Sequence, residues 1–381
     1  MALDGPSTDR RKVLKLSAAA GVVSATSLLA GCTSSANGEQ TSESAVVDDI
    51  EDLPEVEMRI AHTSDPDPQN FPEHLSRTFK NYMETRTGGK FTVDISAGGE
   101  LGTTGDTVEQ AMDGTLEGVF SLAEGALAPF YPNINVFSVP YIFPDLELAN
   151  RVVDKEFGDT INEDFLDQTG LRVISHVDQG GFRSFSANEP IESADDLEGL
   201  SIRTQPIASH QEMVRQLGAS PESVDWTETY DALDQGVVDG QENPIPAFTL
   251  GNFEEVQDYI MLNGPIYTVC FNTVNDDWYQ DLDPTYQALV DKAGLWAMND
   301  ARAVTRILRE RDLRYIQEEH GVEVYDPTEE EINELREMTQ EPVEDFIRDE
   351  MDNPELVDEL YDAIEREQDA LPGYGDDVFY P

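Results

Sequence analysis

The sequence predicts an α/β fold built from two domains, and three observations support this prediction. The chain has 381 residues, enough for two ordinary domains that each bury a sizeable core. Strand-like and helix-like segments alternate along it, as they do in α/β domains with mostly parallel sheets. The run 285–321 contains no proline and, as one helix, would extend about 55 Å, which is longer than a domain is wide. We therefore expect this helix to bridge two domains or to bend near Gly294.

The predicted elements begin after Pro54. A helix is expected at 72–89, because Pro72 is suited to a helix start and Gly88 to a helix end. Further helices are expected at 104–112, 149–168, 208–217 and 227–235, and the acidic segment 328–366 is also expected to be helical. Strands are expected at 56–63, 90–98, 118–123, 171–177, 182–187 and 200–204.

Acidic residues dominate the composition. The chain has 78 Asp and Glu against 24 Lys and Arg, which gives a formal net charge of −54. Such a chain is a poor binder of nucleic acids, so no nucleic-acid partner is expected. With 39% apolar residues, however, it is a folding sequence. Together these properties indicate a halophilic source, because molar salt shortens the Debye length to about 3 Å or less. A merely acidic protein is the alternative.

Residues 1–31 have the features of an export signal. Arg10 and Arg11 precede an apolar stretch, 16–30, which is shorter than the roughly 20 residues needed to span a bilayer. The paired arginines resemble a twin-arginine (Tat) signal, which exports folded proteins.

The end of this signal, Leu-Ala-Gly-Cys, resembles a lipobox. Cys32 is therefore expected to carry a lipid that anchors the chain to the outer face of the cell membrane; the alternative is a cleaved signal with an incidental cysteine. Residues 32–54 are small, polar and acidic, and they predict a disordered tether. Cys270 is the other cysteine, so no disulfide is expected.

Catalytic and metal-binding signatures are scarce. The sequence contains no Gly-x-Gly-x-x-Gly, no phosphate loop, no Gly-x-Ser-x-Gly and no Cys-x-x-Cys. The five histidines lie far apart without the spacing of metal ligands. Carboxylates are so numerous that no pair stands out as an acid–base couple. The sequence therefore predicts neither an enzyme nor a cofactor nor a metal site.

The stretch GVVDGQENP, 236–244, crowds four polar side chains into five positions. Gly236 is suited to ending the preceding helix in the left-handed conformation. The two valines are expected to form a short buried strand, with 239–243 beyond its carboxyl end and Pro244 starting the next helix. Ligands of open α/β sheets bind beyond the carboxyl ends of strands, so a binding site is expected here.

This stretch and several others resemble the solute-binding proteins of TRAP transporters, the tripartite ATP-independent type (the DctP-like family). The matching segments, in chain order, are TGGKFTVDISAGGELG, AMDGTLEGVF, NVFSVPYIFPDLELA, SADDLEGLSIRTQP, LGASPESVDWTETYDALDQGVVDGQENP and EEVQDYI. They lie within about 56–325. The chain departs from the family at ELGTTGDTVE and between Val119 and Tyr131, where family members have loops that help to line the cleft.

The resemblance implies a periplasmic-binding-protein-like fold, with two α/β domains, a cleft between them and a long helix that spans both. Domain I would comprise 55–180 and 268–308, and domain II would comprise 181–267 and 309–381. It also implies a monomeric extracytoplasmic receptor that closes over a small organic acid anion. The receptor would deliver this carboxylate to the small and large membrane subunits of a permease driven by an ion gradient.

The matched motifs indicate the residues of the cleft. Arg203, in LSIRTQP, matches the family arginine that pairs with the substrate carboxylate. Arg183, in GGFRSFSANEP, matches a second arginine of the same site, with a purely structural role as the alternative. Asn243 matches an asparagine of the cleft, although its place before Pro244 also suits a helix cap.

The remaining candidates are less specific. Trp226 is expected to be a platform for the apolar face of the ligand, or else a core tryptophan. Glu124 and Tyr230 are further candidates for substrate binding. Gln241 and Glu242 are expected to hold the hinge or to orient the arginines.

Two other functions remain open from the sequence. One is a solute-binding lipoprotein of an ATP-driven transporter. The other, from a different class, is a secreted lipoprotein enzyme that acts on organic acids.

Overall fold

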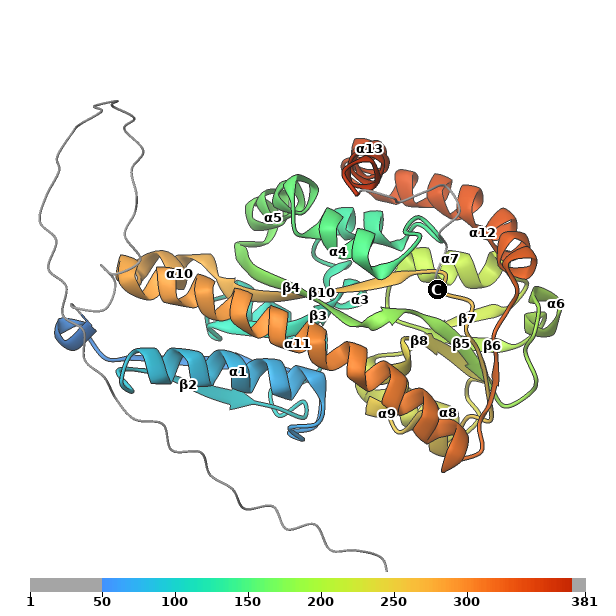
Figure 1. Cartoon of the computed structure of the whole chain (residues 1–381), viewed down its shortest axis with the longest axis horizontal. Helices are drawn as coiled ribbons and strands as arrows, with labels where there is room; N and C mark the ends of the chain where they lie inside the picture. The colour runs from blue at the N-terminus through green and yellow to red at the C-terminus, as the bar shows by residue number, and fades with distance from the viewer. Residues whose placement is uncertain (1–49, 372–381) are drawn as a thin grey trace, which may run out of the picture. The chain divides into compact units, whose positions relative to one another are not determined.

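The computed structural model describes residues 50–371, which form two mixed β-sheets surrounded by helices (Figure 1). This arrangement confirms the α/β class. The expected export signal, Cys32 and most of the tether lie outside the described residues.

The first sheet has five strands in the order β2-β1-β3-β10-β4. Their bounds are β1 (Val56–Ala61), β2 (Phe91–Ser96), β3 (Gly118–Ala123), β4 (Leu171–Phe182) and β10 (Tyr267–Asn275). β1 is parallel to β2 and β3, whereas β10 is antiparallel to β3 and β4. Every residue of β10 is buried, so its sequence shows no alternation, and the strand was absent from the sequence prediction.

The second sheet has six strands in the order β11-β9-β5-β8-β6-β7. Their bounds are β5 (Ser184–Ala187), β6 (Ser201–Thr204), β7 (Ser220–Ser223), β8 (Gly240–Asn243), β9 (Tyr259–Met261) and β11 (Glu323–Tyr325). β6 is parallel to β7 and β8, and β5 is antiparallel to β8 and β9. Both sheets are therefore mixed, not mostly parallel as the sequence suggested.

Helices cover the sheets and connect their strands. Those in the first half of the chain are α1 (Phe71–Arg86), α2 (Thr104–Met112), α3 (Glu124–Leu127), α4 (Leu146–Val153), α5 (Glu156–Thr169) and α6 (Ala194–Leu197). Those in the second half are α7 (Ala208–Gln216), α8 (Thr229–Asp234), α9 (Ile245–Leu250), α10 (Asp276–Asp281), α11 (Pro284–Glu318), α12 (Glu329–Glu350) and α13 (Glu355–Asp369). The 3-10 helices are η1 (Ile50–Asp52), η2 (Pro132–Ser138), η3 (Trp226–Glu228) and η4 (Phe253–Glu255).

Two expected helices are each divided in two. The segment 149–168 contains α4 and α5, and the chain turns at Asp154, whose carboxylate accepts a hydrogen bond of 2.8 Å from Arg302 of α11. The segment 328–366 contains α12 and α13, which are separated by a turn that includes Pro354. In both places a tertiary contact or a proline overrides the helical pattern.

The long helix α11 contains 35 residues in one piece and runs obliquely across the face seen in Figure 1. It packs against α1, against β4 of the first sheet and against α9, the helix that follows β8 of the second sheet. Gly294 lies inside it and permits a close approach, because a Cβ atom there would lie 2.7 Å from the backbone oxygen of Ile174. This is the long helix that the sequence predicted.

The expected strand at Val237 and Val238 is wrong. Val237 is exposed, and the strand begins at Gly240 and includes the polar residues up to Asn243. Gln241, Glu242 and Asn243 of the polar cluster therefore lie within a fully buried strand between β5 and β6, and not beyond a strand end, whereas Asp239 is exposed just before this strand. Gly236 does adopt the expected left-handed conformation, with φ of 65°.

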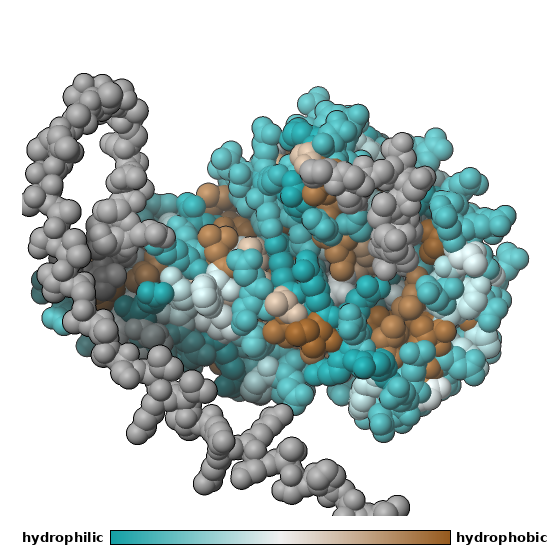
Figure 2. Space-filling model, in the orientation of Figure 1, coloured by the Kyte–Doolittle hydropathy of each residue, from teal (hydrophilic) through white to brown (hydrophobic). Residues whose placement is uncertain are grey.

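Most of the surface seen in Figure 2 is hydrophilic, with separate hydrophobic areas between the polar ones. Among residues 50–371, no helix combines the length and apolar character that a membrane crossing requires.

Candidate functional site

A cavity of about 400 Å³ lies between elements of the two sheets. Its wall includes Ser121 of β3 and Gln179 of β4, from the first sheet, and Arg203 of β6 and Asn243 of β8, from the second. Phe71, Phe130, Trp226 and Leu250 are its large apolar residues. The lining thus combines large apolar side chains with polar and charged ones, which can fix the orientation of a small molecule.

Arg203 is the arginine of this cavity. Only 1% of its surface is exposed, and its Nε donates a hydrogen bond of 3.0 Å to the backbone oxygen of Val224. Its Nη1 has no hydrogen-bond partner within residues 50–371. A buried guanidinium with a free donor is suited to a carboxylate, which can accept two parallel hydrogen bonds from it.

Arg203 remains positively charged although it is buried. Burial lowers the pKa of Arg203 to about 10, while the carboxylate of Glu242 opposes this effect and the positive charge of Arg183 adds to it. The guanidinium is therefore still protonated at neutral pH. A site that keeps a buried positive charge in so acidic a protein favours an anionic ligand.

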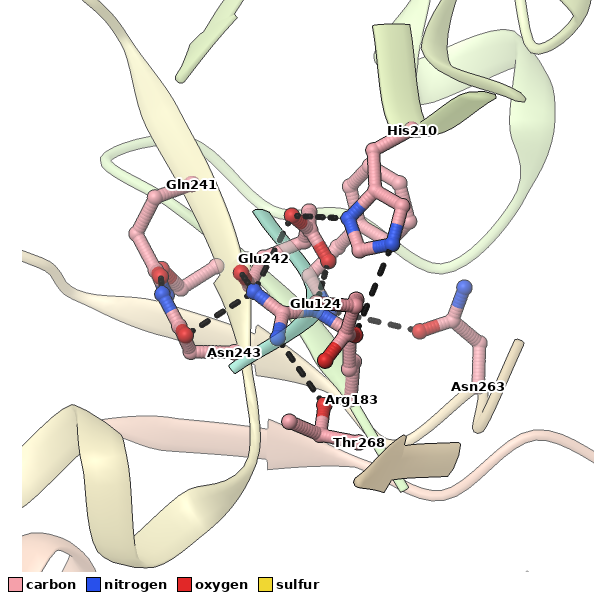
Figure 3. Close-up of polar contacts among 10 residues, drawn as sticks. Glu124, Arg183, His210, Gln241, Glu242, Asn243, Asn263 and Thr268 are labelled. Carbon is pink, nitrogen blue, oxygen red and sulfur yellow. Dashed lines mark hydrogen bonds and ion pairs between the residues drawn. The ribbon is translucent and has the colours of Figure 1, made fainter. Parts of the chain in front are cut away.

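Arg183 lies behind the cavity wall and does not line it. It is fully buried and forms an ion pair with the carboxylate of Glu242. Its other donors reach the Asn243 side chain at 2.9 Å, the Glu242 backbone oxygen at 2.6 Å and Thr268 Oγ1 at 2.9 Å (Figure 3). These contacts occupy each of its three nitrogens, so Arg183 holds the neighbouring Glu242 and Asn243 in position.

Asn243 lines the cavity and links it to Arg183. Its Oδ1 accepts from Arg183, and its Nδ2 donates to Gln241 Oε1, so its side chain caps no helix. The following helix α9 has Pro244 at its N-cap, without a side-chain hydrogen bond. Because Arg203 pairs with Gln241 in the parallel register of β6 and β8, Asn243 lies two residues farther along the same side of the sheet.

Glu124 is fully buried and also lies outside the cavity lining. Neither carboxylate oxygen has a hydrogen-bond partner among the described residues, and the nearest basic group is His210 Nε2, at 3.7 Å from Oε1. Burial raises the pKa of Glu124, against the opposing effects of Arg183 and His210. Figure 3 shows His210 joined by dashed lines to both Glu124 and Glu242, and its Nδ1 lies 3.3 Å from Glu242 Oε1.

Trp226 and Tyr230 lie toward a neighbouring cavity of about 450 Å³. Trp226 lines both cavities, and its ring packs against Phe253 with a centroid distance of 5.5 Å. Tyr230 lines only the second of the two, and its hydroxyl donates to Glu255 at 3.0 Å. Of the six predicted substrate-binding residues, the structure thus brings Arg203, Asn243 and Trp226 to the main cavity.

Sequence reasoning missed most of the polar residues of this cavity, which are Thr63, Ser64, Thr103, Thr104, Asp106, Glu109, Ser121, Gln179, Gln205 and Asp225. Gln205 follows Arg203 by two residues, and the side-chain alternation of a strand was a usable signal. Ser121 lies in the stretch that departs from the family pattern, where no comparable signal exists. Within residues 50–371, no group of three or more His, Cys, Asp or Glu could hold a metal ion.

Comparisons with known proteins agree with this fold. The model of the family "Bacterial extracellular solute-binding protein, family 7" matches residues 60–349. A solute-binding protein of Verminephrobacter eiseniae is 30% identical over 227 residues, which are 59% of this chain and 67% of the relative.

Two solved structures are also similar. A TRAP periplasmic solute-binding protein of Roseobacter denitrificans, solved with bound β-D-glucuronate, has 25% identity and a TM-score of 0.74 over 81% of this chain and 99% of its own. The sugar acid binding protein of Advenella mimigardefordensis, solved with galactonate, has 24% identity and a TM-score of 0.77 over 82% and 99%. The chain therefore belongs to family 7 of the bacterial extracellular solute-binding proteins, and is a solute-binding protein of the TRAP type.

Proposed function

We propose that the protein is the extracytoplasmic receptor of a TRAP transporter and binds a small organic carboxylate in the cavity between its sheets. The observation that carries this proposal is the buried guanidinium of Arg203, which lines the cavity with an unpaired Nη1. In the closed cavity this charge pairs with the ligand carboxylate away from water, where a charge-assisted hydrogen bond is strong.

Sugar acids are the ligand class that the cavity fits best. Besides Arg203, the lining contains hydroxyl and amide groups such as Thr63, Ser64 and Asn243, and it contains the carboxylate of Asp225. These groups are suited to the hydroxyls of a sugar acid, while Trp226 offers an apolar face to its carbon chain. The bound β-D-glucuronate of the Roseobacter protein supports the same class.

The predicted site residues take different roles in this proposal. Arg203, Asn243 and Trp226 contact the ligand. Arg183 holds Asn243 in place from behind the wall, and Glu124 lies buried beside His210 in the same region. Tyr230 lines the neighbouring cavity and does not contact the ligand.

We also propose that the chain closes as two domains, with 55–180 and 268–308 in the first and 181–267 and 309–381 in the second. The strands support this division, because those of the first sheet lie within 56–182 and 267–275 and those of the second lie within 184–261 and 323–325. Helix α13, which this division assigns to the second domain, contacts α4 and α5 of the first domain. The closed receptor then delivers its ligand to the small and large membrane subunits as a monomer.

Anchoring through Cys32 belongs to the same proposal, with export by a twin-arginine signal. A membrane-bound receptor stays near its permease, and stable anchoring takes more than one lipid chain. In cells that express the full chain, Cys32→Ser should move the protein from the membrane fraction to the soluble fraction, whereas Ser35→Ala should not. Equal membrane retention of Cys32→Ser would refute lipidation at this residue.

The proposed function is tested by a thermal-shift screen of the mature chain in 2 M potassium chloride. The panel pairs each acid with its neutral counterpart, for example glucuronate with glucose. An acid present at 100 times its Kd should stabilise the fold by about 2.7 kcal/mol, and glucose should have no effect. A screen in which no organic acid raises the Tm would overturn the proposal.

The two alternatives have separate tests. An enzyme would convert the bound acid, whereas a receptor returns the acid unchanged. Mass spectrometry of the recovered ligand therefore distinguishes an enzyme from a receptor. A receptor of an ATP-driven transporter would have an ATPase gene nearby. The TRAP proposal instead predicts genes for two membrane subunits beside this one.

A further inference from the structure

Another cavity, of about 370 Å³, lies next to the main cavity and shares Phe71 and Leu250 with it. Its wall is formed by the loop before α1, by α9 and η4, and by the second half of α11, which lies beside α9 (Figure 1). Its charged lining residues are Asp67, Glu254, Arg311 and Asp312. We call it the acidic cavity, because three of these four residues are acids.

One of the three acids has its own cation. Arg311 Nε and Nη2 lie 2.7 Å and 2.6 Å from Asp312 Oδ1, and Thr249 Oγ1 donates to Asp312 Oδ2 at 2.8 Å. Both oxygens of Asp312 are therefore paired. Within residues 50–371, Arg311 is the one basic residue that lines this cavity. The lining thus leaves Asp67 and Glu254 without an opposing charge.

Glu254 is the unsatisfied group of the acidic cavity. Only 9% of its surface is exposed, and its Oε2 has no hydrogen-bond partner within residues 50–371. Burial raises the pKa of Glu254, against the effects of its own backbone N–H and of His320. A buried acceptor without a partner costs free energy, and native proteins pair the great majority of such groups. A ligand that brings a positively charged donor would satisfy this carboxylate.

The rest of the wall is suited to a carbon chain. Phe71, Leu250 and Leu308 line the cavity with apolar side chains, and Tyr315 adds an aromatic ring. The hydroxyl of Tyr315 is bonded to His320 at 2.9 Å, whereas 42% of the residue is exposed, and a cation is attracted to the face of such a ring. Because the described residues contain no group of three or more acids, histidines or cysteines that could hold a metal ion, the wall favours an organic cation.

We propose that the acidic cavity binds a small organic amine, with its ammonium group on Glu254 and its carbon chain against Leu308 and Tyr315. Asp67 adds a second negative charge from the loop before α1. Asp67 and Glu254 belong to the first and the second proposed domain, so a bound amine offsets acids of both. This site is separate from the carboxylate site and does not depend on it.

The test compares n-butylammonium with 1-butanol, which lacks the charge, and with tetramethylammonium, which lacks N–H donors. Dissociation constants come from ligand-observed NMR titrations of the mature chain at pH 8 in 2 M potassium chloride. Potassium ions are in excess there, so a site that only collects cations is already filled. Butylammonium should bind at least tenfold more tightly than either of the other compounds.

Two matched variants test the assigned carboxylate. Glu254→Gln keeps the shape of the side chain but removes its charge, and it should weaken butylammonium binding at least tenfold. Glu255→Gln removes the same charge from the exposed neighbouring residue, which does not line this cavity, and it should bind within twofold of the wild type. An equal loss in both variants would show a general effect of charge and would overturn the inference.

A third variant leaves the buried wall unchanged. Asp67 is exposed, and its Oδ1 accepts from the backbone N–H of Gln69 at 2.9 Å, a bond that an asparagine side chain can also accept. Asp67→Asn should therefore fold as the wild type does and weaken butylammonium binding about threefold. Unchanged binding in both Asp67→Asn and Glu254→Gln would overturn the proposed site.

The main cavity provides the last distinction. Butylammonium should still bind in the presence of saturating glucuronate, because the two compounds occupy different cavities. Competition between them would place the amine in the main cavity and overturn the inference. If butylammonium does not bind, or binds no better than butanol, the inference fails, whereas the proposed function is still decided by the organic acids alone.

Discussion

Glu242 lies fully buried between Arg183 and His210, in the centre of the polar network behind the cavity. Burial alone would raise the pKa of Glu242, but the charge of Arg183, together with His210, lowers it to about 2. Its ionised carboxylate thus compensates the buried guanidinium that holds Asn243. The network stabilises the wall of the site only as long as both charges are present.

Glu242→Gln should therefore destabilise the fold in a pH-dependent way. Because the folded pKa is below the ordinary value of 4.5, the ionised group contributes stability above pH 4.5 and loses it as the pH falls toward 2. At pH 7 the variant leaves Arg183 buried without its charge partner, which should cost about 3–5 kcal/mol. The difference in unfolding free energy from the wild type should shrink toward pH 2, as measured by urea denaturation.

The exposed Glu57 provides the control for this comparison. Glu57→Gln should change the unfolding free energy by no more than about 0.5 kcal/mol at any of these pH values. A cost of Glu242→Gln that is the same at pH 7 and pH 3 would show that the contacts of Glu242 stabilise the fold by packing and not by charge.

At the scale of single residues, the sequence predicted those site positions that a motif marks. Arg203 and Asn243 line the cavity as their motifs suggested, whereas Arg183 lies behind it with its nitrogens bonded to neighbouring residues. A local sequence pattern cannot predict which of two similar arginines faces a cavity. The orientation of Arg183 depends on partners about 60 residues away in the chain, such as Glu242. Ser121 depends on Asn272 in the same way.

At the scale of elements, the structure depends on close approaches that single glycines permit. Helix α11 contains 35 residues, which corresponds to about 52 Å, and it contacts α1, β4 of the first sheet and α9, the helix that follows β8 of the second. Gly294 faces the backbone of β4 at Ile174. The sequence predicted this helix from its length and lack of proline, with either a bridge between two domains or a bend near Gly294, but it did not predict the packing role of Gly294.

Gly294→Ala tests this role. Alanine favours a helix by about 1 kcal/mol over glycine, so an exposed glycine in a helix would gain stability from the change. Here the new Cβ would lie 2.7 Å from the Ile174 backbone oxygen, which a sheet strand cannot move aside easily. The variant should instead lose about 1–3 kcal/mol in urea denaturation.

Gly105, in α2, is the matched control, because a Cβ there would have only one atom within 4 Å, at 3.9 Å. Gly105→Ala should not be destabilised. If Gly294→Ala were as stable as the wild type, α11 would have to lie farther from β4 than the structure shows.

Strand β8 shows why a buried polar strand was not predicted from the sequence. Its four residues are polar or glycine, yet all are buried, so hydrophobic patterning favoured the two preceding valines. The side chains of Gln241 and Asn243 are paired: Gln241 donates a hydrogen bond to Ser186 of β5, and Asn243 accepts one from Arg183 and donates one to Gln241. Buried polar strands contradict the usual pattern, and such contradictions occur at functional sites.

At the scale of the whole molecule, the net charge of −54 has to be reconciled with a stable fold. Repulsion between surface carboxylates acts over a Debye length of about 10 Å at 0.1 M salt, but over only about 3 Å at 1 M. The fold class was predictable because it follows from the length of the chain and from strand-like and helix-like segments that alternate along all of it. The mixed sheets were not, since the direction of β10 and β5 depends on pairing between distant segments.

The Tm should therefore climb steeply between 0.1 M and 2 M sodium chloride. The same rise should occur with potassium chloride, because screening depends on ionic strength and not on one bound cation. Calorimetry or circular dichroism of the mature chain measures this profile. A Tm that stays flat across the range would contradict a halophilic origin.

If Arg203 binds the carboxylate of the ligand inside the cavity, the Arg203→Lys variant should bind it much more weakly, which titration calorimetry measures. A lysine keeps the charge but lacks the planar fork, and truncating one partner of a desolvated charge pair costs about 2–5 kcal/mol. The affinity for the best organic acid of the panel should fall roughly thirty-fold to several thousand-fold in Arg203→Lys, and nearly as far in Arg203→Ala. The exposed Arg215 of α7 is the matched control, and Arg215→Lys should bind as the wild type does. Wild-type affinity in Arg203→Lys would contradict the account.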